Sequence, residues 1–164
     1  MSNRILAFIV LLPIAGVIGF AAGRATAESG TVAEAWAPDG ASRVRIVRKF
    51  SFGLKDQRVM VGAADQESEV RALAPDEDAG DILWAPDGSI AGVVLNGSTL
   101  AVIDPAARRI IYELPLLAQR DGSRMARGVG FSANAMAITF DDCPKRGAGC
   151  RPRLLALPKF IPVE

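Results

Sequence analysis

Few side chains in this sequence could act in catalysis or bind a metal, and the absence of histidine reduces the number of candidate sites further. The 164 residues contain no histidine and two cysteines. Without an imidazole, the chain alone cannot supply a Ser-His-Asp or Cys-His nucleophile arrangement, or a histidine-ligated zinc, copper or iron site. A serine–lysine pair would have to use Lys49, Lys55, Lys145 or Lys159, and none of these lies in a recognisable motif. The sequence therefore predicts no catalytic residue, no metal site and no cofactor.

The carboxylates fall into three groups, and each group has a structural explanation. Asp39 and Asp87 could form a pair, but each lies in a Pro-Asp-Gly segment and is expected to cap its own turn. Asp141 and Asp142 could bind a cation. Because adjacent residues of a strand project to opposite faces, they are instead expected to form the shoulder of a hairpin. The acidic segment 76–81 lacks the residue spacing of a calcium loop and is interpreted as a solvated connector.

The two cysteines are expected to form a structural disulfide. Cys143 and Cys150 bracket a segment rich in Gly, Pro and charge, between predicted strands at 136–140 and 153–157. Equal numbers of residues on the two sides would place the cysteines opposite each other. A redox-active pair would normally have C-x-x-C spacing, and two thiolates alone leave a zinc coordination shell incomplete.

The same hairpin carries a concentrated basic patch, formed by Lys145, Arg146, Arg151 and Arg153. These residues could bind anionic lipid headgroups or an acidic protein partner. The alternative is a solvated tip whose charges protect edge strands. The whole chain has 19 Lys and Arg residues and 18 Asp and Glu residues, and this near-zero net charge argues against a nucleic-acid partner.

The amino terminus predicts export. Residues 5–23 are uncharged and apolar, and as a helix they would span about 28 Å, close to the thickness of a bilayer core. They are interpreted as a single-pass inner-membrane anchor that leaves residues 28–164 in the periplasm. The alternative is a signal peptide, residues 1–27, which is cleaved after Ala27 at an A-x-A site and releases the domain into the periplasm.

A five-residue sequence, WAPDG, occurs at 36–40 and again at 84–88, and a degenerate copy, FSANA, occurs at 131–135. The aromatic residues are separated by 48 positions (36 to 84) and 47 positions (84 to 131), which indicates three repeats at about 34–74, 82–115 and 129–160. Both tryptophans are expected to pack between repeats. The residues assigned to the two turns are Trp36, Pro38, Asp39, Gly40, Trp84, Pro86, Asp87 and Gly88.

Each repeat is predicted to be an antiparallel meander of three or four strands. In the second copy, β-branched strands at 90–95 and 99–103 flank Asn96-Gly97, a strong hairpin signal, and a third strand follows at 110–114. In the first copy a turn is expected at 55–57.

The second copy, WAPDGSIAGVVL followed by LAVID, resembles the blade motif of TolB-type, WD40-like β-propellers. The resemblance implies an all-β fold of three propeller-blade-like meanders after an N-terminal hydrophobic helix. Three repeats could form an incomplete or small propeller, pair as a homodimer that completes a ring, or collapse into a sandwich. The motif is structural and implies no activity.

The favoured function is a non-enzymatic, membrane-tethered or periplasmic module that binds another cell-envelope protein. Contact with envelope proteins is implied by the resemblance alone. One alternative is a carbohydrate-binding or enzymatic propeller with a site in its central channel. Another is an accessory subunit that completes a propeller with a partner chain.

Overall fold

The computed structural model describes residues 29–51, 54–117 and 122–158 of the chain. These residues form eleven β-strands, β1 to β11, and no helix. The predicted membrane anchor or signal peptide and its cleavage site lie outside the described residues. No helix within the described ranges has the length and apolar character needed to cross a membrane.

The strands form three separate antiparallel sheets, which follow one another along the chain and are here called blades 1, 2 and 3. Blade 1 contains β1 (Ser29–Trp36), β2 (Arg43–Ser51), β3 (Leu54–Ala63) and β4 (Gln66–Ala72). Blade 2 contains β5 (Ala79–Trp84), β6 (Ala91–Leu95), β7 (Thr99–Asp104) and β8 (Arg109–Pro115). Blade 3 contains β9 (Arg124–Phe131), β10 (Ala137–Pro144) and β11 (Arg151–Ala156).

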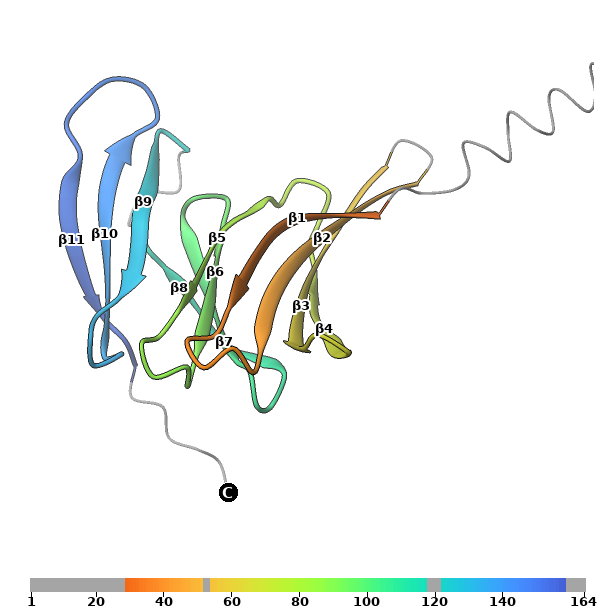
Figure 1. Cartoon of the computed structure of the whole chain (residues 1–164). Coiled ribbons are helices and arrows are strands. Elements are labelled where there is room, and N and C mark those ends of the chain that lie inside the picture. The colour runs from red at the N-terminus through yellow and green to blue at the C-terminus, as the bar shows by residue number, and fades with distance from the viewer. Residues whose placement is uncertain (1–28, 52–53, 118–121, 159–164) are drawn as a thin grey trace, which may run out of the picture.

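The blades stand side by side and pack face to face, as the blades of a β-propeller do (Figure 1). The fold is therefore all-β with three blade-like meanders, as predicted, and the sheets do not merge into a sandwich. The first strand of blade 2, β5, contacts the first strands of both neighbouring blades, β1 and β9, so these three strands lie along the inner side of the arc. In each blade the first strand ends at the aromatic residue, and the aromatic turn then leads into the second strand.

Antiparallel strand order gives the arc two distinct rims, one at each end of its strands. The three aromatic turns lie at one end, here called the turn end (Figure 1). The opposite end, here called the hairpin end, carries the β6–β7 connection, the β10–β11 connection and the start of β1 at Ser29. Asn96 and Gly97 form the β6–β7 connection with positive φ values of 52° and 63°, the conformation of the hairpin turn predicted there.

The turn expected at 55–57 is wrong, because these residues belong to β3. The pairing of β2 with β3 continues to Ser51 opposite Leu54, so the connection lies at 52–53, outside the described residues. The polar character of this segment suggested a turn. In the structure, backbone pairing continues through it, and Asp56 forms an ion pair with Arg58 at 2.9 Å, two residues along the same strand.

The three aromatic turns share one hydrogen-bonding pattern, which explains the repeated pentapeptide. In every copy the residue four positions after the aromatic donates its N–H to the carbonyl one position after the aromatic, at 2.9 Å. That donor is Gly40, Gly88 or Ala135, with φ values of 69°, 72° and 54°. Glycine is favoured here because a side chain is strained at positive φ. The degenerate third copy therefore keeps the turn with alanine in the strained position.

The side chain before each of these residues caps its own turn. An oxygen of Asp39 accepts the N–H of Ala41 at 2.9 Å, and an oxygen of Asp87 accepts the N–H of Ser89 at 3.0 Å. The Ser89 hydroxyl also donates to Asp87, and these two bonds hold the pKa of the Asp87 carboxyl below its usual value. Asn134 replaces the aspartate in the third copy and accepts the N–H of Met136 at 3.2 Å. Asp39 and Asp87 thus act within their own turns.

Two apolar clusters hold the blades together, one at each interface. The first lies between blades 1 and 2 and includes Val44, Ile46, Val59, Val93 and Ile103. The second lies between blades 2 and 3 and includes Leu83, Leu100, Val102, Ile138 and Phe140. A middle blade therefore buries both of its faces, which is why all five residues of β6 are buried.

We expect different outcomes when the same turn position is changed in two copies: a loss of stability at Gly88 and almost no change at Ala135. Gly88→Ala should lower the free energy of unfolding by about 1 to 2 kcal/mol. The cause is the backbone conformation, since a Cβ at Gly88 would lie 3.7 Å from its nearest neighbour, an ordinary contact. Ala135→Gly removes the same strain and should change stability by less than about 0.5 kcal/mol. Urea unfolding of both variants measures this, and equal losses at the two sites would contradict the shared turn.

Candidate functional site

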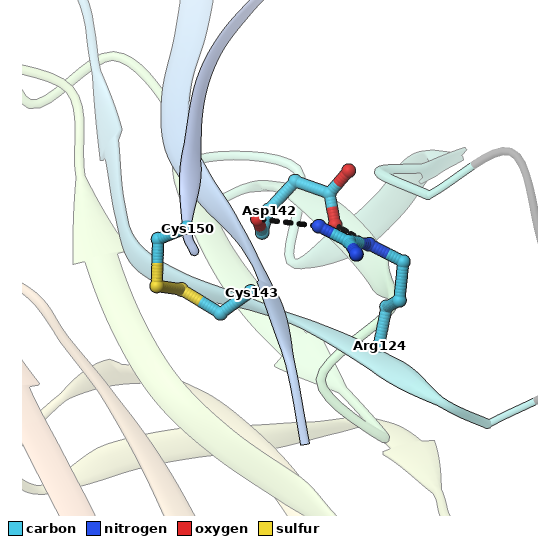
Figure 2. Close-up of a disulfide and its surroundings, with 4 residues drawn as sticks. All are labelled: Arg124, Asp142, Cys143 and Cys150. Carbon is cyan, nitrogen blue, oxygen red and sulfur yellow. Dashed lines mark hydrogen bonds and ion pairs between the residues drawn. A yellow bond between two sulfur atoms is a disulfide. The ribbon is translucent and has the colours of Figure 1, made fainter. Parts of the chain in front are cut away.

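The hairpin between β10 and β11 is braced at its tip. Strand pairing ends with Asp142 opposite Arg151, and the next residues, Cys143 and Cys150, form the predicted disulfide (Figure 2). On the other side, the N–H of Lys145 donates to the carbonyl of Ser123 at 2.8 Å, which ties the tip to the start of β9. A covalent bond and a backbone hydrogen bond therefore both hold the loop that carries the basic residues.

The basic residues predicted from the sequence lie together on this hairpin and are exposed. Arg153 lies 3.6 Å from the carboxylate of Asp142. Within the described part of the chain, Lys145, Arg146 and Arg151 take part in no ion pair. The hairpin therefore presents uncompensated positive charge in a fixed geometry.

Asp142 is a buried carboxylate, which the sequence did not predict. Asp141 is exposed, as expected for a hairpin shoulder, whereas Asp142 retains only 7% of its surface and projects toward blade 2. Its oxygen Oδ1 lies 2.5 Å from Nε of Arg124, and Nη2 of Arg124 donates to its backbone carbonyl at 2.8 Å (Figure 2).

Comparison of the repeats shows that a carboxylate at the position of Asp142 is unusual. Asp142 lies eleven residues after Phe131, and the same offset from Trp84 gives Leu95, a member of the apolar cluster between blades 1 and 2. Replacing an apolar contact with a buried ion pair seldom adds stability. The Asp142–Arg124 pair instead fixes the guanidinium of Arg124. Alignment of the third repeat to the second would have revealed Asp142, but nothing in the sequence identifies Arg124 as its partner.

A groove of about 530 Å³ lies next to this pair, between blade 3 and the segment that follows β8. Its apolar part comes from Leu116 and Leu117 after β8, from Phe140 of β10, and from two leucines of β11. Its polar part consists of Arg124, Asp142, Arg151 and Arg153. The structure thus places two of the four predicted basic residues on this groove, while Lys145 and Arg146 line a separate hollow at the tip.

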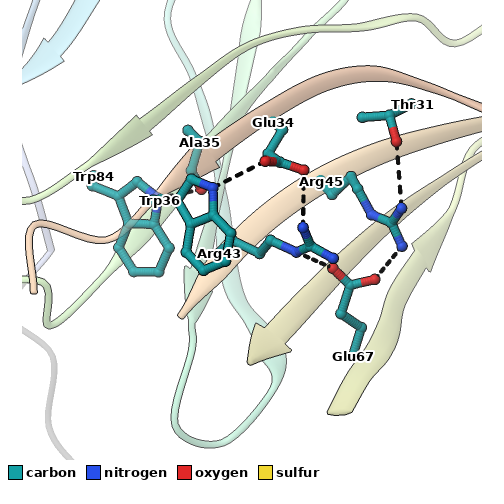
Figure 3. A network of polar contacts seen from close by, with 8 residues as sticks. All are labelled: Thr31, Glu34, Ala35, Trp36, Arg43, Arg45, Glu67 and Trp84. Atoms are coloured by element: carbon teal, nitrogen blue, oxygen red, sulfur yellow. Dashed lines mark hydrogen bonds and ion pairs between the residues drawn. The ribbon is translucent and has the colours of Figure 1, made fainter. Parts of the chain in front are cut away.

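The two tryptophans lie in different surroundings, although they occupy the same position of the repeat. Trp84 packs against the cluster between blades 1 and 2, and its Nε1 donates to the carbonyl of Ala35 at 3.1 Å (Figure 3). Trp36 is 46% exposed; its Nε1 donates to Glu34 at 2.9 Å, and the guanidinium of Arg43 lies 5.1 Å from its ring centre. The prediction that both tryptophans pack between repeats is correct for Trp84 and wrong for Trp36. Trp36 lies on the face of blade 1 that points away from blade 2, where no described residue supplies another blade.

The face of blade 1 that carries Trp36 is charged where its counterparts are apolar. It is here called the outer face of blade 1. The positions two residues before, seven after and nine after each aromatic face the preceding blade. In blade 2 they are Ile82, Ala91 and Val93; in blade 3 they are Val129, Ile138 and Phe140; in blade 1 they are Glu34, Arg43 and Arg45.

These charges satisfy one another across three strands. Glu67 of β4 accepts Nε of Arg43 at 2.6 Å and also pairs with Arg45 (Figure 3). Arg43 reaches Glu34 of β1 at 3.1 Å as well. Packing a further blade here would desolvate this network without new partners, at a cost of several kcal/mol per ion. A polar outer face of this kind is typical of terminal repeats in stacked-repeat proteins.

The far face of blade 3 is also polar at equivalent positions. Val44 and Ile46 of blade 1 point toward blade 2 and are fully buried. Their counterparts in blade 3 are Thr139 and Asp141, and both are exposed. Apolar stacking positions are therefore replaced at both ends of the arc.

Comparison with known proteins supports the fold and does not extend to a family. The sequence matches no protein-family profile, and no curated protein matches it. Among solved structures, an oligogalacturonate lyase in complex with manganese has a TM-score of 0.53 at 16% identity, over 80% of this chain and 36% of that chain. The chain thus spans about a third of the length of that protein. The likeness shows a propeller-like fold.

Two further structures are less similar. KlHsv2 with loop 6CD replaced by a Gly-Ser linker gives a TM-score of 0.44 at 18% identity, over 71% of this chain and 37% of that one. The β-propeller domain of Myceliophthora thermophila Cps50 (Swd1) gives 0.40 at 9% identity, over 68% and 49%.

Transplanting apolar residues onto the outer face of blade 1 should make it associate. The triple substitution Glu34→Ile, Arg43→Ala and Arg45→Val gives this face the residues of blade 2 at the same offsets. We expect residues 28–164 with these changes to form oligomers or aggregates, because a large exposed apolar sheet face promotes association. Sedimentation velocity measures the mass. A matched control replaces the exposed residues Asp81 and Arg109 with Ile and Val, and an identical mass distribution for the two variants would contradict the assignment.

Proposed function

We propose that the chain is a non-enzymatic β-propeller-like module, tethered to the inner membrane through residues 5–23, with residues 28–164 in the periplasm. In this proposal it binds another envelope protein through the disulfide-held basic hairpin, defined as residues 142–153. The non-enzymatic role rests on the absence of histidine from the sequence and of a recognisable nucleophile motif.

The observation that carries the proposal is the uncompensated charge on a rigid tip. Lys145, Arg146 and Arg151 find no ion pair among the described residues, and the disulfide fixes the loop between them. A charged surface that is already ordered loses little conformational entropy on binding and attracts an oppositely charged partner from a distance. Partner binding therefore explains both the charge and the brace.

Two further features agree with a location at the periplasmic face of a membrane. Disulfides persist in oxidising compartments such as the periplasm, and the cysteines of this chain are joined. Ser29, where β1 begins, lies at the same end of the arc as the basic hairpin (Figure 1). Residues 24–28 would span at most about 18 Å when extended, so an anchored domain would hold this end close to the membrane.

The test is photochemical crosslinking, with a reagent that does not require lysine, in washed membranes of cells that produce the full chain. We expect a crosslinked species that contains the chain and a second protein. Lys145→Glu with Arg146→Glu should reduce it at least about tenfold, because the two reversals lower the net charge of the tip by four units (two residues, from +1 to −1 each). The control is Arg108→Glu with Arg109→Glu, at the turn end, which makes the same change in net charge.

Two outcomes would overturn the proposal. If both double variants crosslink like the unmodified chain, the hairpin is not the binding surface. If the chain is absent from carbonate-washed membranes and begins at Glu28, the tether is wrong, and the domain is instead released after Ala27.

A further inference from the structure

We propose that the groove beside Asp142 binds an acidic peptide segment with a large apolar side chain, supplied by the partner protein. This inference rests on the proposed function and names the chemistry of the partner. The groove is defined by Leu116, Leu117, Phe140 and Leu155 as its apolar part, and by Arg124, Arg151 and Arg153 as its basic rim.

The charges of the groove specify an anionic ligand. Three guanidinium groups and a single carboxylate, that of Asp142, line the groove, which leaves a surplus of two positive charges. Asp142 holds Arg124 at 2.5 Å and lies 3.6 Å from Arg153, while Arg151 has no ion pair among the described residues. Guanidinium groups favour carboxylates through paired hydrogen bonds, so acidic side chains fit the rim.

The apolar wall of the groove favours an apolar side chain as its ligand. Leu116, Leu117 and Phe140 are each at most 6% exposed and belong to the apolar cluster between blades 2 and 3. They form the wall of an open groove whose volume of about 530 Å³ exceeds that of any single side chain. A leucine or phenylalanine of a peptide would complete this wall, as apolar anchors do in the centre of protein interfaces.

The edge of blade 3 explains why side chains, and not strand pairing, would carry recognition. Blades 1 and 2 have four strands, whereas β11 is the last described strand of blade 3. Pro152 lacks an N–H, and within a sheet a proline is tolerated where its nitrogen faces away from the neighbouring strand. It therefore interrupts the donor row on the open edge of β11. A peptide that paired with β11 along its full length would lack one backbone hydrogen bond, the one that Pro152 cannot donate. The groove is therefore the better site.

The experiment uses the full chain in detergent and fluorescent synthetic peptides of about ten residues. The probe carries a Leu-Phe pair flanked by glutamates. One control peptide has lysine in place of every glutamate, and the other has serine in place of Leu and Phe. Fluorescence anisotropy gives the dissociation constants. We expect the probe to bind at least about tenfold more tightly than either control, and more weakly as salt concentration rises.

Two variants with opposite expected effects locate the site. Arg151→Glu with Arg153→Glu should weaken probe binding at least about tenfold, because it reverses the charge of the rim. Asp142→Asn keeps an oxygen that can accept from Arg124 and removes the competing negative charge, so probe binding should become several-fold tighter. Arg108→Glu with Arg109→Glu should leave binding unchanged. Thermal melting of each variant confirms that it folds.

Equal binding of the three peptides, or weaker probe binding by Asp142→Asn with an unchanged melting temperature, would overturn the groove proposal. Vesicles that contain phosphatidylglycerol provide a separate arm. If they displace the probe while neutral phosphatidylcholine vesicles do not, the surface binds lipid headgroups and the peptide proposal is wrong. If the peptides fail but Lys145→Glu with Arg146→Glu still abolishes the crosslink, the partner binds at the tip alone and the proposed function stands.

Discussion

Burial of apolar sheet faces against one another is the interaction on which this structure depends. A single meander cannot bury its own apolar faces, so each blade gains stability from its neighbour. Blade 2 is covered on both sides, and all five residues of β6 are buried as a result. The shared aromatic turns support this stacking, since they orient Trp84 and Phe131 into the two interfaces.

The same constraint explains what happens where stacking ends. Positions that hold Ile82, Ala91 and Val93 in blade 2 hold charged residues in blade 1, and these form ion pairs within their own sheet. On the side of blade 3 that faces blade 2, Asp142 takes the place of a core leucine and holds an arginine at the rim of a groove. The first substitution satisfies its own charges and blocks further stacking. The second leaves positive charge unsatisfied and so favours a ligand. A ring completed through the outer face of blade 1 would have to desolvate Glu34, Arg43 and Arg45.

Much of the architecture could be predicted from the sequence because it depends on local signals. The positions of the three turns follow from Pro-Asp-Gly and its spacing, the β6–β7 hairpin from Asn96-Gly97, and the disulfide from the symmetric flanks of Cys143 and Cys150. The errors arise where tertiary context decides. Lys55, Asp56 and Gln57 continue a strand because β2 pairs with them. Trp36 has the same local sequence as Trp84, but its exposure depends on whether a neighbouring blade is present. Asp142 and Arg124 meet only through the pairing of β9 with β10.

The central claim is that the outer face of blade 1 is a solvated end of the arc and not a surface for another blade. Acrylamide quenching of single-tryptophan variants of the full chain tests it most directly. Trp84→Phe leaves Trp36 as the only tryptophan, and Trp36→Phe leaves Trp84. The account predicts that Trp36 is quenched several-fold more efficiently and emits at longer wavelength than Trp84, at all protein concentrations. Equal protection of both tryptophans would show that a second copy or another blade covers the outer face, and would contradict the account.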